Sequence, residues 1–166
     1  MELQARAREL ERKDVSREWA RVSGEGIKKM LRVTRKLEFA AAHFYHNPKL
    51  SAEENRRIFG KCNNPKGHGH NYVLEVTVAG EPDPKTGMIL DLNELKAILD
   101  REVTARMDHK HLNYDVPELS GKIPTCEEIA TVIWNLLEPK IRQGRLEHIR
   151  LYESPDLFVD CARNGR

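Results

Sequence analysis

The sequence predicts an α+β domain in which antiparallel strands pack against two helices. Two long segments, residues 31–43 and 70–80, alternate apolar and polar side chains, as strands with one buried face do. Two later segments, residues 91–103 and 125–137, repeat apolar side chains every three to four positions, which is typical of amphipathic helices. Two short alternating segments follow between residues 146 and 162. The predicted order is therefore strand, strand, helix, helix, strand, strand.

A change in composition near residue 30 predicts where the folded domain begins. Residues 1–29 are densely charged, so we expect an extension with little core of its own, with a helix around Leu3, Leu10, Val15 and Trp19. Residues 30–166 then form one domain, and a chain of 166 residues is long enough to bury a real core. Met30 is an alternative start of the chain.

The parity of the apolar residues predicts which face of each long strand is buried. In the first strand the shared face carries Val33, Leu37, Phe39, Ala41 and His43. In the second it carries Tyr72, Leu74, Val76 and Val78. Side chains two apart on a strand point to the same side, so each set faces the core. The segment EPDPKTG at 81–87 is rich in turn residues and predicts a hairpin-type connection.

Both predicted helices have a readable first turn. Asp91 and Glu94 are spaced as in a capping box, and Thr125 and Glu128 repeat this spacing. Apolar stripes follow each start, namely Leu92, Leu95, Ile98, Leu99 and Val103 in the first helix and Ile129, Val132, Ile133, Leu136 and Leu137 in the second. The segment between the helices, 107–124, has no clear period.

Composition excludes several classes of protein. The net charge is +2 and aromatic residues make up 6% of the chain, without the basic and aromatic alternation of a nucleic-acid platform. No apolar run approaches the ~18 residues of a membrane span, and residues 1–29 lack a secretory signal. The three cysteines form no C-x-x-C pair, which favours a reducing, cytoplasmic location. We therefore expect no nucleic-acid or membrane partner.

Three histidines are candidate metal ligands. His68 and His70 lie two apart at the start of the second strand, and His43 ends the apolar face of the first. If the strands pair, the three imidazoles converge at one edge of the core. Three neutral histidines leave one tetrahedral position open, as in a catalytic zinc site. The alternative is that they are simply polar residues at a strand entrance.

Cys62 is a candidate base or nucleophile beside that metal. It precedes His68 by six positions in a loop rich in Asn, Pro and Gly, which can fold the thiol back toward the metal. A nearby cation, or a histidine beside the thiol, would lower the pKa of the thiol. The alternative is that Cys62 is the fourth ligand of a closed structural site.

Three further residues are weaker candidates. Asp108 and His109 are adjacent, and a carboxylate can orient a histidine that moves protons, although solvated loop residues are the default interpretation. Glu153 shares the parity of Ile149 and Leu151, which places a carboxylate on an apolar face. A buried carboxylate needs partners, and a ligand with two adjacent N–H donors would suit it. The alternative is that this strand end already reaches solvent.

With these residues in view, the chain resembles the 6-pyruvoyl-tetrahydropterin and 6-carboxy-tetrahydropterin synthase family. The resemblance runs from about Val33 to Asp160. The motifs that carry it are FAAAH at 39–43, FGKCNNPKGHGHNY at 59–72, GEPDPKTGMILDLNELK at 80–96, MDHKHLN at 107–113, PTCEEIA at 124–130 and YES at 152–154. Several separated motifs in one order are more specific than any single motif.

The resemblance implies a role for each candidate. It implies that the zinc ligands are His43, His68 and His70. It implies that Cys62 is the general base and that Asp108 and His109 complete a proton-relay triad. It places Glu153 as the anchor of the pterin and Thr125 near the pterin ring. The implied substrate is 7,8-dihydroneopterin triphosphate, whose side chain is acidified by zinc and deprotonated by the cysteine.

The resemblance also implies a T-fold, a four-stranded antiparallel sheet with two helices inserted between strands two and three. Subunits of this family form trimers whose sheets close into a barrel, and two trimers stack into a homohexamer. The active site then lies between subunits, where Asp108 and His109 can act on a neighbour's Cys62. Three features depart from the family pattern: Glu128 stands where Asn is common, Met107 replaces a usual Leu, and residues 1–29 have no counterpart.

The family contains two reactions, and the loop length favours one of them. Five residues separate Cys62 from His68, which resembles the branch that eliminates triphosphate to give 6-pyruvoyl-tetrahydropterin. The 6-carboxy-tetrahydropterin branch, on the route to queuosine-type deazapurines, more often has a shorter spacing and is the alternative. A non-catalytic zinc or pterin-binding module is a further alternative, although a binding module needs no base.

Overall fold

The computed structural model describes residues 30–163 of the chain, so the helix and the boundary predicted for residues 1–29 lie outside the described residues. The strands are β1 (Leu31–His43), β2 (His68–Gly80), β3 (Lys110–His111), β4 (Arg145–Ser154) and β5 (Leu157–Ala162). The helices are α2 (Ala52–Phe59), α3 (Leu92–Leu99), α4 (Ala105–Met107) and α5 (Cys126–Leu137). A π-helical turn, Asp100–Thr104, joins α3 to α4, and 3-10 turns occupy Gly60–Asn63, Pro117–Leu119 and Glu138–Lys140.

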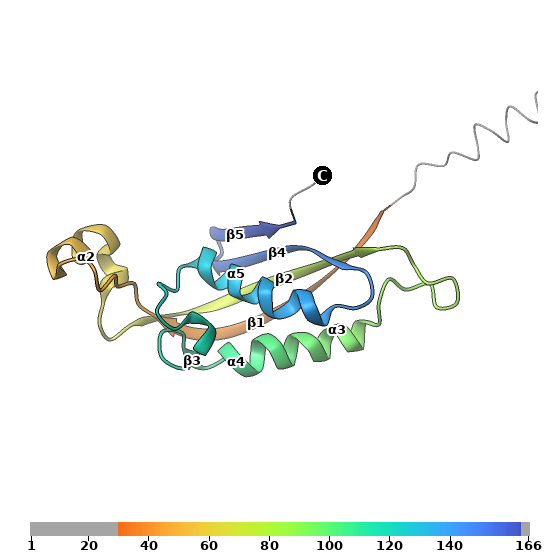
Figure 1. Ribbon diagram of the computed structural model, residues 1–166, viewed down its shortest axis with the longest axis horizontal. Coiled ribbons are helices and arrows are strands. Elements are labelled where there is room, and N and C mark those ends of the chain that lie inside the picture. Colours follow the sequence, from red (N-terminus) through yellow and green to blue (C-terminus); the bar gives the residue numbers. More distant parts are fainter. Residues whose placement is uncertain (1–29, 164–166) are drawn as a thin grey trace, which may run out of the picture. The chain divides into compact units, whose positions relative to one another are not determined.

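The strands form one sheet in the order β3-β1-β2-β4-β5. The pairs β1–β2, β2–β4 and β4–β5 are antiparallel, and β3 runs parallel to β1. Helices α3, α4 and α5 lie together on one face of the sheet, whereas α2 lies beyond the ends of β1 and β2 (Figure 1). The predicted α+β class is confirmed, with α3, α4 and α5 all placed between β2 and β4.

The core lies between the sheet and these helices. The predicted parity holds on both long strands, because Phe39 and Tyr72 stack with ring centroids 5.1 Å apart and both are buried. Leu95 and Ile133 supply the helix side of the same core and are fully buried. Burying such apolar side chains contributes roughly 1.5–3 kcal/mol each and holds the helices on the sheet.

The opposite face of the sheet is polar. Lys36, Glu75, Arg150 and Asp160 occupy paired positions on four neighbouring strands, with alternating charge. Lys36 Nζ lies 2.8 Å from Glu75 Oε1, and Arg150 Nε lies 2.7 Å from Asp160 Oδ1. Opposite charges directly across a sheet stabilise the pairing, and a register slip would place side chains on the wrong face.

Three details differ from the sequence predictions. The sheet has five strands rather than four, because two residues of the irregular segment add β3 to the edge of β1. The turn at 81–87 forms, with the Asp83 N–H donating to the Met88 carbonyl at 2.9 Å, but it joins β2 to α3 and not two strands. Leu92 is 44% exposed and stands outside the buried stripe of α3. These differences arise because pairing and helix placement depend on distant residues.

Across residues 30–163, no helix is long and apolar enough to cross a membrane.

Candidate metal centre and the pocket around it

The end of the β1–β2 hairpin brings the three predicted histidines together. The antiparallel register pairs His43 with His68 and Ala41 with His70, so all three imidazoles project from the helix-covered face. One ligand nitrogen from each ring lies within 4.8 Å of the other two, and His43 Nε2 is 3.1 Å from His68 Nε2. Strand parity predicted this convergence, and within residues 30–163 no other group of three or more His, Cys, Asp or Glu could hold a metal.

The nitrogen atoms at this cluster fit a metal ion. The Pro124 carbonyl lies 2.9 Å from His43 Nδ1 and can only accept, so Nδ1 carries the proton and Nε2 presents its lone pair to the cluster. His43 is fully buried, and this burial, together with the neighbouring histidines, lowers its pKa to about 4. Two buried nitrogens, His68 Nδ1 and His70 Nε2, have no hydrogen-bond partner. Three imidazoles whose ring nitrogens converge, two of them with an unpartnered buried nitrogen, suit a divalent cation such as zinc.

The backbone before His68 is constrained by close packing. Gly67 has φ +75°, and a Cβ there would lie 2.8 Å from His111 Nε2 and 3.1 Å from the His43 carbonyl oxygen. Only glycine fits both this conformation and this space. His111 therefore packs against the backbone that carries two of the candidate metal ligands, His68 and His70, a contact that no pattern in the sequence indicated.

Cys62 lies near the cluster without belonging to it. Its carbonyl accepts a hydrogen bond from the Tyr45 N–H at 2.8 Å, and the Asn63 side chain donates to the Tyr45 carbonyl at 2.7 Å. The three histidines form the metal group without the Cys62 sulfur, which disfavours the closed four-ligand site. Burial raises the pKa of the Cys62 thiol and the charge of Glu153 adds to this effect. The expected lowering of the Cys62 pKa by a neighbouring histidine is therefore not seen within this chain.

Glu153 is buried in the same pocket. It is 9% exposed, so the alternative of a solvated strand end is wrong. The Tyr45 hydroxyl donates to Oε2 at 3.5 Å, and His70 Nε2 lies 3.6 Å from Oε1. Among the described ion pairs, none joins Glu153 to a lysine or arginine. Burial, and then the charge of Glu153, raise the pKa of both Tyr45 and Tyr72, so these two hydroxyls stay neutral. Such a carboxylate is free to accept donors from a ligand.

Tyr45 and Cys126 are pocket residues that the sequence analysis missed. Tyr45 continues the odd-numbered face of β1 past His43, and its ring packs edge-on against that imidazole at 5.0 Å. Parity could have identified it. Cys126 is buried at the first position of α5, and burial is the main cause that raises the pKa of its thiol to about 12. No spacing pattern would have indicated this.

Thr125 marks the start of α5. Its hydroxyl accepts the Glu128 N–H at 3.3 Å, so it caps the helix. The adjacent Pro124 is the residue whose carbonyl contacts His43, which places this helix start next to the metal cluster. Glu128, which departs from the family pattern, pairs with Lys122 at 2.6 Å.

Asp108 and His109 form a hydrogen-bonded pair, but they lie in the turn between α4 and β3. Asp108 Oδ1 accepts the Ala40 N–H at 2.8 Å, and Oδ2 lies 2.9 Å from His109 Nδ1. The Ala40 N–H and the His109 side chain lower the pKa of Asp108. His109 has φ +57°, rare for a residue other than glycine, and its side chain is 82% exposed.

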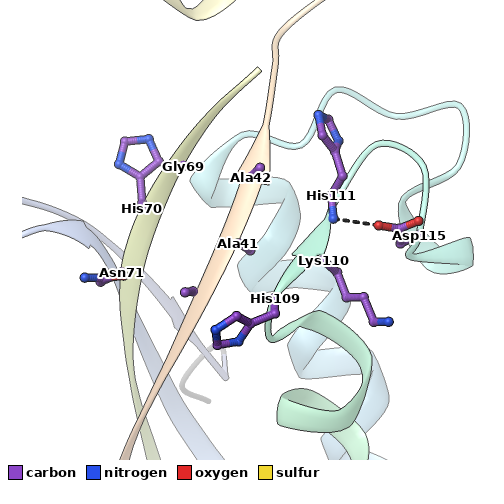
Figure 2. A pocket seen from close by; sticks show the side chains of 10 residues that line it. Ala41, Ala42, Gly69, His70, Asn71, His109, Lys110, His111 and Asp115 are labelled. Atoms are coloured by element: carbon purple, nitrogen blue, oxygen red, sulfur yellow. Dashed lines mark hydrogen bonds between the residues drawn. The ribbon is translucent and has the colours of Figure 1, made fainter. Parts of the chain in front are cut away.

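Cys62 does not meet this pair within one chain. Across residues 30–163, its thiol forms no described hydrogen bond or ion pair with Asp108 or His109. Asp108 is anchored at Ala40 and Cys62 at Tyr45, and five extended residues span roughly 16 Å. An open cavity of about 580 Å³ lies beside the exposed His109. Figure 2 shows His109 beside β1, whereas His70 projects from β2.

Comparisons with known proteins agree with this geometry. The family model described as 6-pyruvoyl tetrahydropterin synthase matches residues 32–164. The chain is 41% identical to the human 6-pyruvoyl tetrahydrobiopterin synthase over 136 residues, covering 82% of this chain and 94% of that protein. It is 31% identical to the 6-carboxy-5,6,7,8-tetrahydropterin synthase of Rickettsia felis over 150 residues, covering 79% and 99%. The solved 6-pyruvoyl tetrahydropterin synthase of Caenorhabditis elegans superposes with a TM-score of 0.77 at 34% identity, covering 82% of this chain and 97% of that one.

Proposed function

The chain belongs to the 6-pyruvoyl tetrahydropterin synthase family, and from this premise we propose that it is a zinc-dependent lyase. The proposed reaction converts 7,8-dihydroneopterin triphosphate to 6-pyruvoyl-tetrahydropterin and triphosphate. The observation that carries the proposal is the cluster of three histidines with the buried Glu153 carboxylate beside it and the Cys62 thiol near that carboxylate. The higher identity to a 6-pyruvoyl relative, 41% against 31% for a 6-carboxy relative, supports this branch.

Each residue of the pocket has a separate role in the proposed reaction. Glu153 accepts two N–H donors from the guanidine-like edge of the pterin, and so fixes the ring. Zinc held by His43, His68 and His70 would polarise the hydroxylated side chain and raise its C–H acidity. Cys62 then removes a proton from a side-chain carbon as general base. Thr125 lies at the helix start beside the pterin ring.

The proton relay would be completed by a second subunit. Asp108 orients His109, and the exposed imidazole passes the proton to or from the Cys62 of a neighbour. The separation of the pair from Cys62 within one chain supports this arrangement. We propose a homohexamer, a dimer of trimers in which the sheets close into barrels and cover strand edges.

The 6-carboxy-tetrahydropterin reaction is the second candidate, because a relative of that name covers most of this chain. A non-catalytic zinc or pterin-binding module is a third, and the presence of Cys62, Asp108 and His109 argues against it. The decisive experiment is to incubate the zinc-loaded protein with 7,8-dihydroneopterin triphosphate and identify the products by mass. We expect 6-pyruvoyl-tetrahydropterin and triphosphate. A 6-carboxy product with acetaldehyde would establish the second candidate, and pterin binding without turnover would establish the third.

A further inference from the structure

The connection between β1 and β2 contains a basic segment without carboxylate partners. Residues 56–66 contain four cations and no acidic residue, and Arg56, Arg57, Lys61 and Lys66 are all exposed. Among the ion pairs of residues 30–163, none involves these four side chains, although many exposed cations elsewhere are paired, such as Lys36 with Glu75. Clustered like charges repel one another, so an anion bound there would stabilise the segment.

The nearest acidic side chain on this connection is already engaged. Glu54 accepts the Ser51 N–H at 2.8 Å and closes the capping box at the start of α2. Its negative charge therefore lies in the first turn of α2, at the opposite end from the two arginines of the last turn. Arg56 and Arg57 occupy the last turn of α2, which stands beyond the ends of β1 and β2 and apart from α3 and α5 (Figure 1). The positive charge thus faces solvent.

The same segment is tied to the metal pocket. Lys61 directly precedes Cys62, and Lys66 is two residues before His68. The 2.8 Å hydrogen bond between the Tyr45 N–H and the Cys62 carbonyl anchors this turn to the chain that leaves β1. The cations therefore flank the cysteine along the chain, at the side of the pocket where the β1–β2 connection lies.

We infer that this basic segment, Arg56, Arg57, Lys61 and Lys66, holds the polyphosphate tail of the substrate. The inference rests on the proposed function, because that substrate has a triphosphate on the third carbon of its side chain. This third carbon is adjacent to the two side-chain carbons on which the metal and Cys62 would act when Glu153 holds the pterin. Arginine can bind phosphate oxygens in pairs, and lysine supplies compact charge. The chemical class of the ligand is an inorganic or esterified triphosphate.

Binding of inorganic triphosphate to the zinc-loaded full chain tests the inference. We would compare the pair variants R56Q/R57Q and K61Q/K66Q with the parent by calorimetry and by competitive inhibition of turnover. Each exposed charge contact contributes a factor of about 2 to 5 to the affinity. Each double variant should therefore weaken triphosphate binding by about 4- to 25-fold. The KM for the pterin triphosphate should rise in parallel, and higher ionic strength should weaken binding to the parent more than to the variants.

Two controls separate this site from a general charge effect. K85Q/K140Q removes two other exposed lysines and should leave triphosphate binding within about 2-fold of the parent, since distant surface charges are screened. R56K/R57K keeps the charge but loses the paired contacts of arginine, so its affinity should lie between those of the parent and R56Q/R57Q. Binding of 7,8-dihydroneopterin, which lacks phosphates, should be the same in all variants.

The outcomes for the segment and for the enzyme are distinguishable. Equal triphosphate binding in the parent and both pair variants, or equal weakening in K85Q/K140Q, overturns the inference while leaving the proposed reaction intact. Loss of dihydroneopterin binding in the pair variants also overturns it, because the segment would then act on the whole pocket. If the parent does not convert the pterin triphosphate but the pair variants still lose triphosphate affinity, the proposed function fails and the anion site stands.

Discussion

Replacing Glu153 with glutamine tests the pocket most directly. The substitution keeps the shape of the side chain and removes one negative charge from a group that is only 9% exposed. In the proposed complex the carboxylate accepts two N–H bonds from the pterin. Glutamine keeps one acceptor oxygen but turns an NH2 group toward the second donor.

The magnitude follows from those two contacts. A hydrogen bond to a charged, poorly solvated group contributes about 1.5–3 kcal/mol. Losing one bond and the charge assistance of the other should cost about 3–4 kcal/mol. That corresponds to a fall of about 10²- to 10³-fold in kcat/KM. The low exposure of Glu153 means that solvent screens this loss little.

The assay measures steady-state kcat/KM together with zinc content and thermal unfolding. Zinc should remain at about one per chain, because three histidines suffice for a catalytic site. Zinc content is measured because Glu153 Oε1 lies 3.6 Å from His70 Nε2, so the substitution could disturb this candidate metal ligand. The unfolding temperature should not fall, since the variant removes a buried charge that has no lysine or arginine partner.

Two results would refute the reasoning. A fall in kcat/KM of less than about 10-fold with zinc retained would show that Glu153 does not anchor the pterin. Loss of zinc in the variant would instead show that the carboxylate supports the metal.

Three further predictions follow from the pocket. Cys62→Ala should abolish turnover while keeping about one zinc per chain, measured by metal analysis, and loss of the metal would support the four-ligand alternative. The free energy of unfolding of the metal-free protein should fall by about 2 kcal/mol between pH 7 and pH 5. The reason is that the pKa of His43 is about 4 when folded and about 6.5 when unfolded. Only the unfolded state gains the proton in this window, so stability is retained above pH ~6.5 and lost as the pH falls, and urea unfolding of His43→Gln should show a shallower dependence. Gly67→Ala should destabilise the protein by about 1–3 kcal/mol more than Gly87→Ala, because both have positive φ but only Gly67 has backbone and the His111 ring within 3.1 Å of the new Cβ. Equal denaturation midpoints for these two variants would contradict the packing at Gly67.

Local patterns in the sequence predicted much of the fold. A strand places alternate residues on opposite faces, so the parity of Phe39 and Tyr72 was enough to orient both long strands. The helix starts at Asp91 and Thr125 were equally readable, because a capping side chain bonds to backbone within three residues.

Other elements depend on distant contacts and could not be predicted. The two residues of β3 become a strand only because β1 presents a free edge beside them. The π-helical turn Asp100–Thr104 contains the buried Glu102, which pairs with Arg101 and Arg106. No periodicity of the sequence indicates where a helix will widen by one residue.

The candidate site shows the same division. The sequence by itself determined that His43, His68 and His70 share one face and that Glu153 lies on an apolar one, because side-chain direction along a strand is a local property. Only the tertiary structure decided the distances between them, the proton on His43 Nδ1 and the separation of Cys62 from the Asp108–His109 pair. Those quantities depend on strand register, on the start of α5 and on β1 lying between the two groups, and such contacts form only when residues far apart in the chain are packed together.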